Sequence, residues 1–314
     1  MKHSTALLLH LLLGSCSAYT YKNVAIRGKA TQSTQADSAY AMAGNAIDGN
    51  RDHDSNSGSC SSTSSQTNPW WTVDLLESYM VTSLIITNRG DGSSEKHEDA
   101  MIHIGNSLEY NGLDNPLVAV IPLTPAGKFS EIFLPKLVEG RYVTVIVPGR
   151  EKTLSLCEVE VYGYRAPTGE NLALKGKATQ SSLYDMYGNA YNAIDGNRHN
   201  VRSDGSCSTT KQESDPWWRL DLIKTHKVFS VKISNRRDGR YSPRLNGAEI
   251  RIGDSLKNNG NSNPRCAVIK NIPAGATKEF QCNGMDGRYV NIVIPGRQEF
   301  LTLCEVEVYG SVLD

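Results

Sequence analysis

Two short polar segments of this 314-residue chain carry side chains that could bind a ligand rich in oxygen atoms. Their members are Arg89, Asp91 and Lys96 in the first segment, and Arg236, Asp238 and Arg244 in the second. In each segment a guanidinium group lies two residues from a carboxylate that could orient it, and a second cation follows. Guanidinium groups pair well with the hydroxyl and ring oxygens of a sugar. The alternative interpretation is a salt bridge in an exposed turn, which is the more common arrangement of such residues.

A second polar motif spans residues 45–50 and includes Asn45, Asp48 and Asn50. Side-chain and backbone oxygens that converge there could hold a hard cation such as Ca²⁺. The alternative is an Asx turn, because Asn and Asp favour turns whether or not a cation is bound. The motif is too short for an EF-hand loop.

Both motifs belong to a domain that is written twice. Asn23 recurs as Asn171 and Cys60 recurs as Cys207, at offsets of 148 and 147 residues, and the motif at 45–50 returns at 192–197. A repeat of this length indicates tandem domains rather than a solenoid. We therefore predict a first domain at 19–164 and a second at 165–314, joined by a short segment that contains Pro167 and Gly169.

The N-terminus and the cysteines indicate an exported protein. Residues 1–18 combine an apolar run with the small residues Cys16, Ser17 and Ala18, a pattern typical of a cleaved signal peptide. Six cysteines then remain, and an even number in an exported chain favours disulfides. The repeat suggests the simplest pairing, which is Cys60–Cys157, Cys207–Cys304 and an extra Cys266–Cys282 bridge in the second copy.

The composition argues against several other classes of protein. Lys and Arg together number 33, as do Asp and Glu, so no basic surplus points to nucleic acid. No segment after residue 18 has the length and hydrophobicity of a membrane span. The two copies share no histidine, so a duplicated nucleophile–histidine site is not visible, and we predict that the chain is not an enzyme.

The pattern of residues predicts an all-β fold. Short β-branched runs such as residues 141–147 alternate with Gly, Pro, Asn and Asp, and no long stretch has helical periodicity. This organisation is typical of a β-sandwich. The pairs Trp70–Trp71 and Trp217–Trp218 are expected to place one indole ring in each core.

Taken together, these motifs resemble the F-type lectins, or fucolectins, in particular the two-domain fucose-binding lectins of fish. The segments that carry the resemblance are Asn23–Ser33, Asn45–Asn50, Gly58–Cys60, Pro69–Trp71, Asn88–Asp91 and Leu156–Val161, with their counterparts in the second copy. The resemblance implies two tandem jelly-roll, discoidin-like β-sandwich domains with a bound calcium ion in each. It also supports the three predicted disulfides.

The same resemblance assigns roles to individual residues. It implies that the calcium ligands are Asn45, Asp48, Asn50, Ser59 and Glu158 in the first copy, and Asn192, Asp195, Asn197, Ser206 and Glu305 in the second. Its sugar motif combines a histidine with the arginine, acid and basic residues described above. The histidine is replaced by Ser62 in the first copy and by Thr209 in the second. Each replacement removes one hydrogen-bond donor, which is worth about 0.5–1.5 kcal/mol.

Two functional hypotheses follow. The first is a secreted, extracellular, calcium-dependent lectin that recognises terminal L-fucose or a related sugar on the glycans of cells or microbes, in innate immune recognition. The alternative is a discoidin-like adhesion or structural module that does not bind sugar, and the missing histidine favours it. Self-association into a homo-oligomer is compatible with both.

Overall fold

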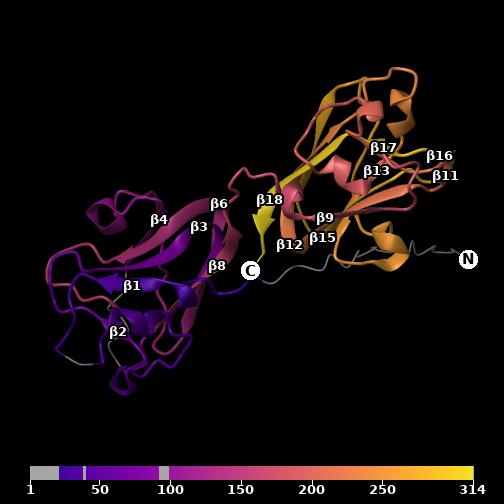
Figure 1. Cartoon of the computed structure of the whole chain (residues 1–314). Helices are drawn as coiled ribbons and strands as arrows, with labels where there is room; N and C mark the ends of the chain where they lie inside the picture. The colour runs from indigo at the N-terminus through magenta and orange to yellow at the C-terminus, as the bar shows by residue number, and fades with distance from the viewer. Residues whose placement is uncertain (1–20, 38–39, 92–98, 314) are drawn as a thin grey trace, which may run out of the picture.

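The computed structural model describes residues 21–37, 40–91 and 99–313 and contains two all-β domains with the same order of strands (Figure 1). The predicted all-β, tandem-domain architecture is therefore confirmed. The predicted signal peptide at 1–18 and Lys96 lie outside the described residues. Among the residues that the structure describes, no helix has the length and hydrophobicity needed to cross a membrane.

Eight strands and four described 3-10 helices make up the first domain. The strands are β1 (Lys29–Gln32), β2 (Ser61–Ser62), β3 (Trp70–Thr87), β4 (Met101–Gly105), β5 (Leu117–Val120), β6 (Phe129–Ile146), β7 (Ser155–Leu156) and β8 (Glu158–Arg165). The helices are η1 (Ala25–Arg27), η2 (Ala43–Ile47), η3 (Ser55–Ser57) and η5 (Glu109–Gly112).

The two long strands β3 and β6 pair with each other and build both layers of the sandwich. The first part of β3 also pairs with β1, whereas its second part pairs with β8. The register is interrupted between Asp74 and Tyr79, where Leu76 has a positive φ of 70° and its N–H donates to Asp74 Oδ1 at 2.7 Å. This bulge lets one strand leave the first layer and enter the second, because a bulge bends and twists a strand. The strand order is β1-β3-β6-β4-β5, and β2 and β7 form a separate ladder.

The second domain repeats this plan and adds one ladder. Its strands are β9 (Lys177–Gln180), β10 (Ser208–Thr209), β11 (Glu213–Ser214), β12 (Trp217–Ser234), β13 (Glu249–Gly253), β14 (Arg265–Val268), β15 (Thr277–Val293), β16 (Gln298–Glu299), β17 (Thr302–Leu303) and β18 (Glu305–Val312). Its 3-10 helices are η6 (Leu172–Lys175), η7 (Ala190–Ala193), η8 (Arg202–Asp204), η9 (Ser242–Leu245) and η10 (Lys257–Gly260). The β11–β16 ladder has only an isolated bridge, Gln66 to Lys152, as its counterpart in the first domain.

Each domain has its own apolar core, and one tryptophan lies at its centre. Trp71 and Trp218 are fully buried, and their indole N–H groups donate to the carbonyls of Ala43 and Ala190, both at 3.0 Å. The neighbouring Trp70 and Trp217 are half-buried. The prediction of one core indole per copy is therefore confirmed. The hydrogen bond matters because a buried N–H without a partner destabilises the fold.

The domains meet where β8 of the first lies near β18 of the second (Figure 1). The Lys227 ammonium group lies 5.3 Å from the ring centre of Tyr164 and 5.6 Å from that of Tyr21. It also forms a 2.7 Å salt bridge with Asp286, and the rings of Tyr164 and Phe229 are 6.0 Å apart. A cation from the second domain is thus held between two tyrosines of the first.

Candidate functional site

Disulfides bring the two ends of each candidate site together. The structure contains Cys60–Cys157 and Cys207–Cys304, each with a sequence separation of 97 residues, and Cys266–Cys282. All three predicted pairings are therefore confirmed. Ser59 precedes Cys60 and Glu158 follows Cys157, so the first bridge draws two of the expected calcium ligands towards each other.

Glu158 is the most unusual polar residue of the first domain. It is fully buried, and its Oε1 accepts a hydrogen bond from the Gly49 N–H at 3.2 Å. Its Oε2 is buried, and no hydrogen-bond partner for it is present among the described residues. Burial, and next the charge of Asp48, raise the pKa of Glu158 to about 7. A buried carboxylate oxygen that lacks a donor is destabilising unless a cation compensates it.

The loop that faces Glu158 is an Asx turn. Asp48 Oδ1 accepts from the Asn50 N–H at 2.8 Å, and Asn50 Oδ1 accepts from the Asp52 N–H at 3.0 Å. The Asn45 amide donates to the Cys60 carbonyl at 3.3 Å, which fastens this loop to the disulfide. The two interpretations of the motif are therefore compatible, since the turn orients oxygens that remain able to coordinate a cation.

Ser59 lies at the edge of the same cluster, where its Oγ is 3.5 Å from the Asn50 amide nitrogen. Within the described part of the chain, no group of three or more His, Cys, Asp or Glu side chains could hold a metal ion. A site here would instead combine two carboxylates with amide, hydroxyl and backbone oxygens, and Ca²⁺ accepts such a mixture.

The second domain repeats this arrangement. Glu305 is fully buried, and its Oε1 accepts from the Gly196 N–H at 3.2 Å. Within the part of the chain that the structure describes, its Oε2 has no hydrogen-bond partner. Burial, followed by the charge of Asp195, raises the pKa of Glu305 to about 8. Asp195 Oδ1 accepts from the Asn197 N–H at 2.9 Å, and the Asn192 amide donates to the Cys207 carbonyl at 3.4 Å. Ser206, the remaining expected ligand, is buried beside that cysteine.

An ion pair behind each cluster holds the loop in place. Arg51 donates to both carboxylate oxygens of Glu160, at 2.5 and 2.8 Å, and the Tyr162 hydroxyl donates to the same group at 2.5 Å. The second domain has the same set in Arg198, Glu307 and Tyr309. Because Arg51 follows Asn50 directly, this bidentate pair fixes the end of the motif at residues 45–50.

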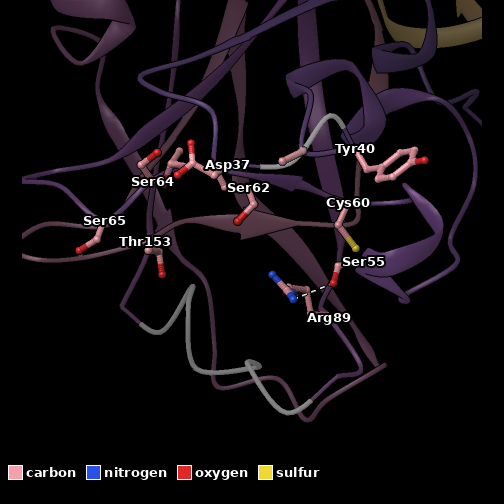
Figure 2. A pocket seen from close by; sticks show the side chains of 12 residues that line it. Asp37, Tyr40, Ser55, Cys60, Ser62, Ser64, Ser65, Arg89 and Thr153 are labelled. Atoms are coloured by element: carbon pink, nitrogen blue, oxygen red, sulfur yellow. Dashed lines mark hydrogen bonds between the residues drawn. The ribbon is translucent and has the colours of Figure 1, made fainter.

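A hollow of about 630 Å³ lies beside the disulfide of the first domain (Figure 2). Arg89 and Ser62 face this space from opposite sides, as Figure 2 shows. Most of the other polar lining groups are hydroxyls, contributed by Ser55, Thr63, Ser64, Ser65 and Thr153, and Asp37 adds a carboxylate. Two of the sequence-predicted residues are thus brought together at one opening.

The guanidinium of Arg89 is held in a fixed orientation. Its Nε donates to Asp91 Oδ1 at 2.8 Å, and its Nη2 donates to Asp91 Oδ2 and to Ser55 Oγ. Its Nη1 is 3.3 Å from Ser155 Oγ, and only 13 % of the side chain is exposed. The Arg89 guanidinium, chiefly, and also Ser55 hold the pKa of Asp91 well below its usual range. Asp91 therefore braces the arginine and does not line the hollow itself.

The backbone that carries Arg89 is positioned by contacts on both sides of it. Asn88 donates through its side-chain amide to the Thr124 carbonyl at 2.6 Å, and the Gly90 N–H donates to the His53 carbonyl at 3.0 Å. A Cβ atom at Gly90 would lie 2.2 Å from the His53 ring, so the histidine side chain has to move to admit a larger residue. The second domain places Arg237 and Asn200 at these two positions and keeps the same backbone hydrogen bond at 3.0 Å.

The corresponding hollow of the second domain is smaller and has a different lining. Its volume is about 180 Å³, and its lining residues are Tyr184, Arg202, Thr209, Arg236, Tyr241, Arg244 and Phe300. The predicted Arg236, Arg244 and Thr209 thus lie together. Asp238 instead lines an adjoining space of about 340 Å³ and is 3.5 Å from Arg236. The Thr209 hydroxyl is buried, donates to the Ser208 carbonyl at 2.8 Å and accepts from Arg202 Nε at 3.3 Å.

Sequence reasoning did not identify several residues of these linings. In the second domain they are Arg202, Tyr184, Tyr241 and Phe300, and in the first they include Ser55 and Thr153. A comparison of the two copies could have drawn attention to them. Arg202 and Phe300 stand at the repeat offset where the first copy has Ser55 and Thr153. The segments that predict the site recur in both copies, whereas these positions differ between them.

Comparison with known proteins gives related matches among family models and individual proteins. A family model described as a NedA-like, galactose-binding domain matches residues 45–145 and again 192–292. Fucolectin-1 of Anguilla japonica is 53 % identical over 146 residues, which cover 46 % of this chain and 82 % of that protein. Fucolectin of Anguilla anguilla is 49 % identical over 146 residues, or 46 % of this chain and 92 % of that protein.

Among solved structures, the chain is similar to an F-lectin, or fucolectin, from the serum of striped bass, Morone saxatilis. The two sequences are 66 % identical, the match covers 94 % of this chain and 100 % of the other, and the TM-score is 0.90. The match therefore includes both domains of the chain.

Proposed function

The chain belongs to the F-type lectin, or fucolectin, family, and we propose that it is a secreted, calcium-dependent lectin that binds terminal L-fucose or a related sugar on glycans. One observation carries the proposal. In each domain the predicted arginine lines the same hollow as the residue at the family's histidine position, Arg89 with Ser62 and Arg236 with Thr209.

The chemistry of the first hollow suits a neutral sugar. Asp91, Ser55 and Ser155 hold the Arg89 guanidinium plane fixed by accepting four of its five N–H groups, which leaves one Nη1 N–H for a ligand as far as the described residues show. Hydroxyl groups surround the opening. A fixed guanidinium loses little side-chain freedom when a ligand binds, which favours affinity. Ser62 replaces the imidazole with a shorter hydroxyl, so each site is expected to bind weakly. Two such sites on one chain gain affinity on a dense glycan surface through effective concentration.

We assign the calcium sites to the clusters around Glu158 and Glu305. The unpaired Oε2 atom of each carboxylate supports this assignment, because it is a buried acceptor without a donor. The residues that would hold the ion are Asn45, Asp48, Asn50, Ser59 and Glu158 in the first domain, with Asn192, Asp195, Asn197, Ser206 and Glu305 in the second. A bound calcium ion would compensate the negative charge of these buried carboxylates. The disulfide connects the cluster to the hollow, since Cys60 lines the hollow and Ser59 precedes it.

Secretion and a role in innate recognition are part of the proposal. Three disulfides favour an oxidising compartment outside the cytosol. The striped bass F-lectin comes from serum. The partners of this chain would then be fucosylated or related glycans on cells or microbes.

Titration calorimetry with L-fucose in the presence of calcium tests the proposal. We expect heat of binding at millimolar sugar for the wild type, its loss from one site in R89A or R236A, and its loss from both sites in the double variant. R27A is a matched control, because Arg27 is exposed at the end of η1 and away from both hollows.

Galactose under the same conditions tests selectivity for the sugar. Absence of any heat with either sugar, in calcium-loaded protein that melts cooperatively, would refute the lectin function. That result would favour the discoidin-like adhesion or structural module, for which the observation is the replacement of the family histidine by Ser62 and Thr209.

A further inference from the structure

The lining of the second hollow differs in charge from that of the first. Among the described residues, the first hollow is lined by Arg89 and Asp37, whose charges balance. The second is lined by Arg202, Arg236 and Arg244 and by no acidic residue. The domains therefore share a fold and a location for the site but not its electrostatics.

The three arginines of the second hollow are interleaved with aromatic rings. The Arg244 guanidinium lies 4.4 Å from the ring centre of Tyr241 and 4.5 Å from that of Phe300. The Arg236 guanidinium lies 4.8 Å from the ring centre of the same tyrosine, Tyr241. Arg202 lies 4.6 Å from Tyr184. Stacking of this kind fixes guanidinium groups in place without using their in-plane N–H donors.

Each of the three arginines has a carboxylate partner, but none of these partners belongs to the described lining of the hollow. Arg202 pairs with Asp185 at 2.5 Å and Arg244 with Glu299 at 3.3 Å, and neither acid lines the hollow. Arg236 reaches Asp238 at the longer distance of 3.5 Å, and its buried Nε has no hydrogen-bond partner among the residues that the structure describes. Arg89, by contrast, uses both Nε and Nη2 on Asp91. Arg236 is therefore less tightly held by its carboxylate than Arg89 is, and among the described residues no group accepts from its buried Nε.

Arg236 lies close to two other guanidinium groups, those of Arg202 and Arg244. Burial lowers the pKa of its guanidinium, and Arg244 and Arg202 lower it further, whereas Asp238 opposes the change. The group stays protonated at neutral pH, because arginine is not deprotonated in proteins. Three guanidinium groups thus converge on this hollow, whereas their partners Asp185, Glu299 and Asp238 are absent from its described lining. The potential at the opening is therefore more positive than in the first domain, which favours an anionic ligand group.

Arg202 is the residue that distinguishes the two domains. It occupies the position of Ser55, at the start of η8 where the first domain has η3. Its Nε donates to Thr209 Oγ1 at 3.3 Å, so its guanidinium lies beside the position where the family has histidine. It also lines the adjoining space of about 340 Å³, together with Arg236. A ligand that extends from one space to the other would contact both arginines.

We propose that the second domain is selective for glycans that carry an anionic substituent, a sulfate ester or a carboxylate, next to the terminal sugar, and that Arg202 determines this selectivity. The first domain retains the neutral, hydroxyl-lined site. This inference rests on the proposed lectin function and specifies the class of ligand for one of its two sites. Planar guanidinium groups suit sulfate and carboxylate because both anions accept two parallel hydrogen bonds.

The test uses the full calcium-loaded chain as R89A, in which the second domain is the remaining sugar site. Calorimetry compares a neutral fucosylated trisaccharide with the same trisaccharide bearing a sulfate ester, and with one bearing a carboxylate. We expect at least one charged form to bind about tenfold more tightly than the neutral form in 50 mM NaCl, a preference that 500 mM NaCl reduces. The charged form that binds more tightly shows whether the preferred anionic substituent is a sulfate ester or a carboxylate.

Variants at two arginines separate a local effect from net charge. R202S introduces the residue of the first domain and should bring the ratio of affinities close to one, whereas R202K should keep part of it. R219S removes the same charge from a residue that stacks on Trp217, outside the hollow, and should leave the ratio unchanged. Should R89A fold poorly, the same comparison of R202S with R219S in the wild-type background decides the matter.

The outcomes distinguish this inference from the function on which it rests. Equal affinity for neutral and charged fucosylated glycans would overturn the inference and leave the lectin function intact. A ratio that R202S does not change would overturn the role of Arg202. Failure of every fucosylated glycan to bind the wild type would overturn the proposed function. A sulfated glycan without fucose that bound in that case would support the anion site alone.

Discussion

Removal of calcium should make the stability of this protein fall as the pH rises, and the effect should originate at Glu158 and Glu305. The pKa of Glu158 changes from 4.5 in the unfolded chain to about 7 in the folded domain. The folded domain therefore binds the proton more tightly, and the calcium-free protein loses stability as the pH rises from 4.5 to 7. A difference of about 2.5 pKa units corresponds to about 3 kcal/mol.

The same protonation should control the affinity for calcium, because the ion binds the ionised carboxylate. With one competing proton and a pKa of about 7, the first site should bind calcium about tenfold more weakly at pH 6 than at pH 8. The pKa of Glu305 is about 8, so the second site should lose about fiftyfold over the same range. The two sites should therefore separate in a titration at pH 6.

The assay is calorimetric titration of chelator-stripped protein with calcium at pH 6, 7 and 8, together with thermal melts with and without calcium. E158Q and E305Q replace each carboxylate with a neutral side chain of the same shape. Each variant should lose calcium binding at its own site, melt higher than the calcium-free wild type at pH 8, and lose the pH dependence contributed by that site.

Among the described residues, His226 also has a shifted pKa near this pH range, and its effect has to be separated. Burial lowers the pKa of His226, so that its contribution to stability is lost as the pH falls through its unfolded value of 6.5. This change opposes that of the glutamates, and it is present in E158Q and E305Q as well, so the difference from the wild type isolates the carboxylates. Calcium affinity that stays constant from pH 6 to 8 in the wild type would refute the reasoning.

Three further predictions concern the scaffold. C60S/C157S should lower the free energy of unfolding by about 4–5 kcal/mol and weaken calcium binding in the first domain. C266S/C282S, which opens a loop with a sequence separation of 16, should lower it by about 3 kcal/mol and leave calcium binding unchanged. Denaturant titrations measure the stabilities and calorimetry the calcium affinities, and equal effects of the two variants on calcium would count against a link between disulfide and cluster. G90A should cost about 1–3 kcal/mol, because its Cβ meets the His53 ring, and H53N should restore most of that loss, as a double-mutant cycle would show. K227A loosens the contact between the domains at Tyr164 and Tyr21, which we expect to set the spacing of the two sites. It should therefore reduce binding to a fucose-coated surface while leaving the affinity for monovalent fucose unchanged. Unchanged surface binding would mean that this contact does not set the spacing.

The sequence predicted much of the fold because local patterns and the repeat carry that information. The β-branched runs, the frequent turns and the offset of 147 or 148 residues indicated two β-sandwiches, and the matched cysteines indicated all three disulfides. It did not predict that β3 and β6 each serve both layers. That feature depends on the bulge at Leu76, where a positive φ is stabilised by Asp74 in a way that the side-chain pattern does not reveal.

The candidate site shows the same division. Residue types and spacing alone singled out Arg89 and Arg236 as a duplicated pair, and the family resemblance pointed to Glu158 and Glu305. Tertiary structure decided which groups surround them, because the residues that meet at a hollow come from segments far apart in the chain. Arg202 and Arg236 line one hollow because the segment before η8 pairs with the loop after β12, through the hydrogen bond from the Arg237 N–H to the Asn200 carbonyl. The unpaired Oε2 of Glu158 arises only once the strand and its loop are packed together. Spacing along a chain records which residues are available, whereas burial, charge compensation and the character of a ligand site depend on distances in space.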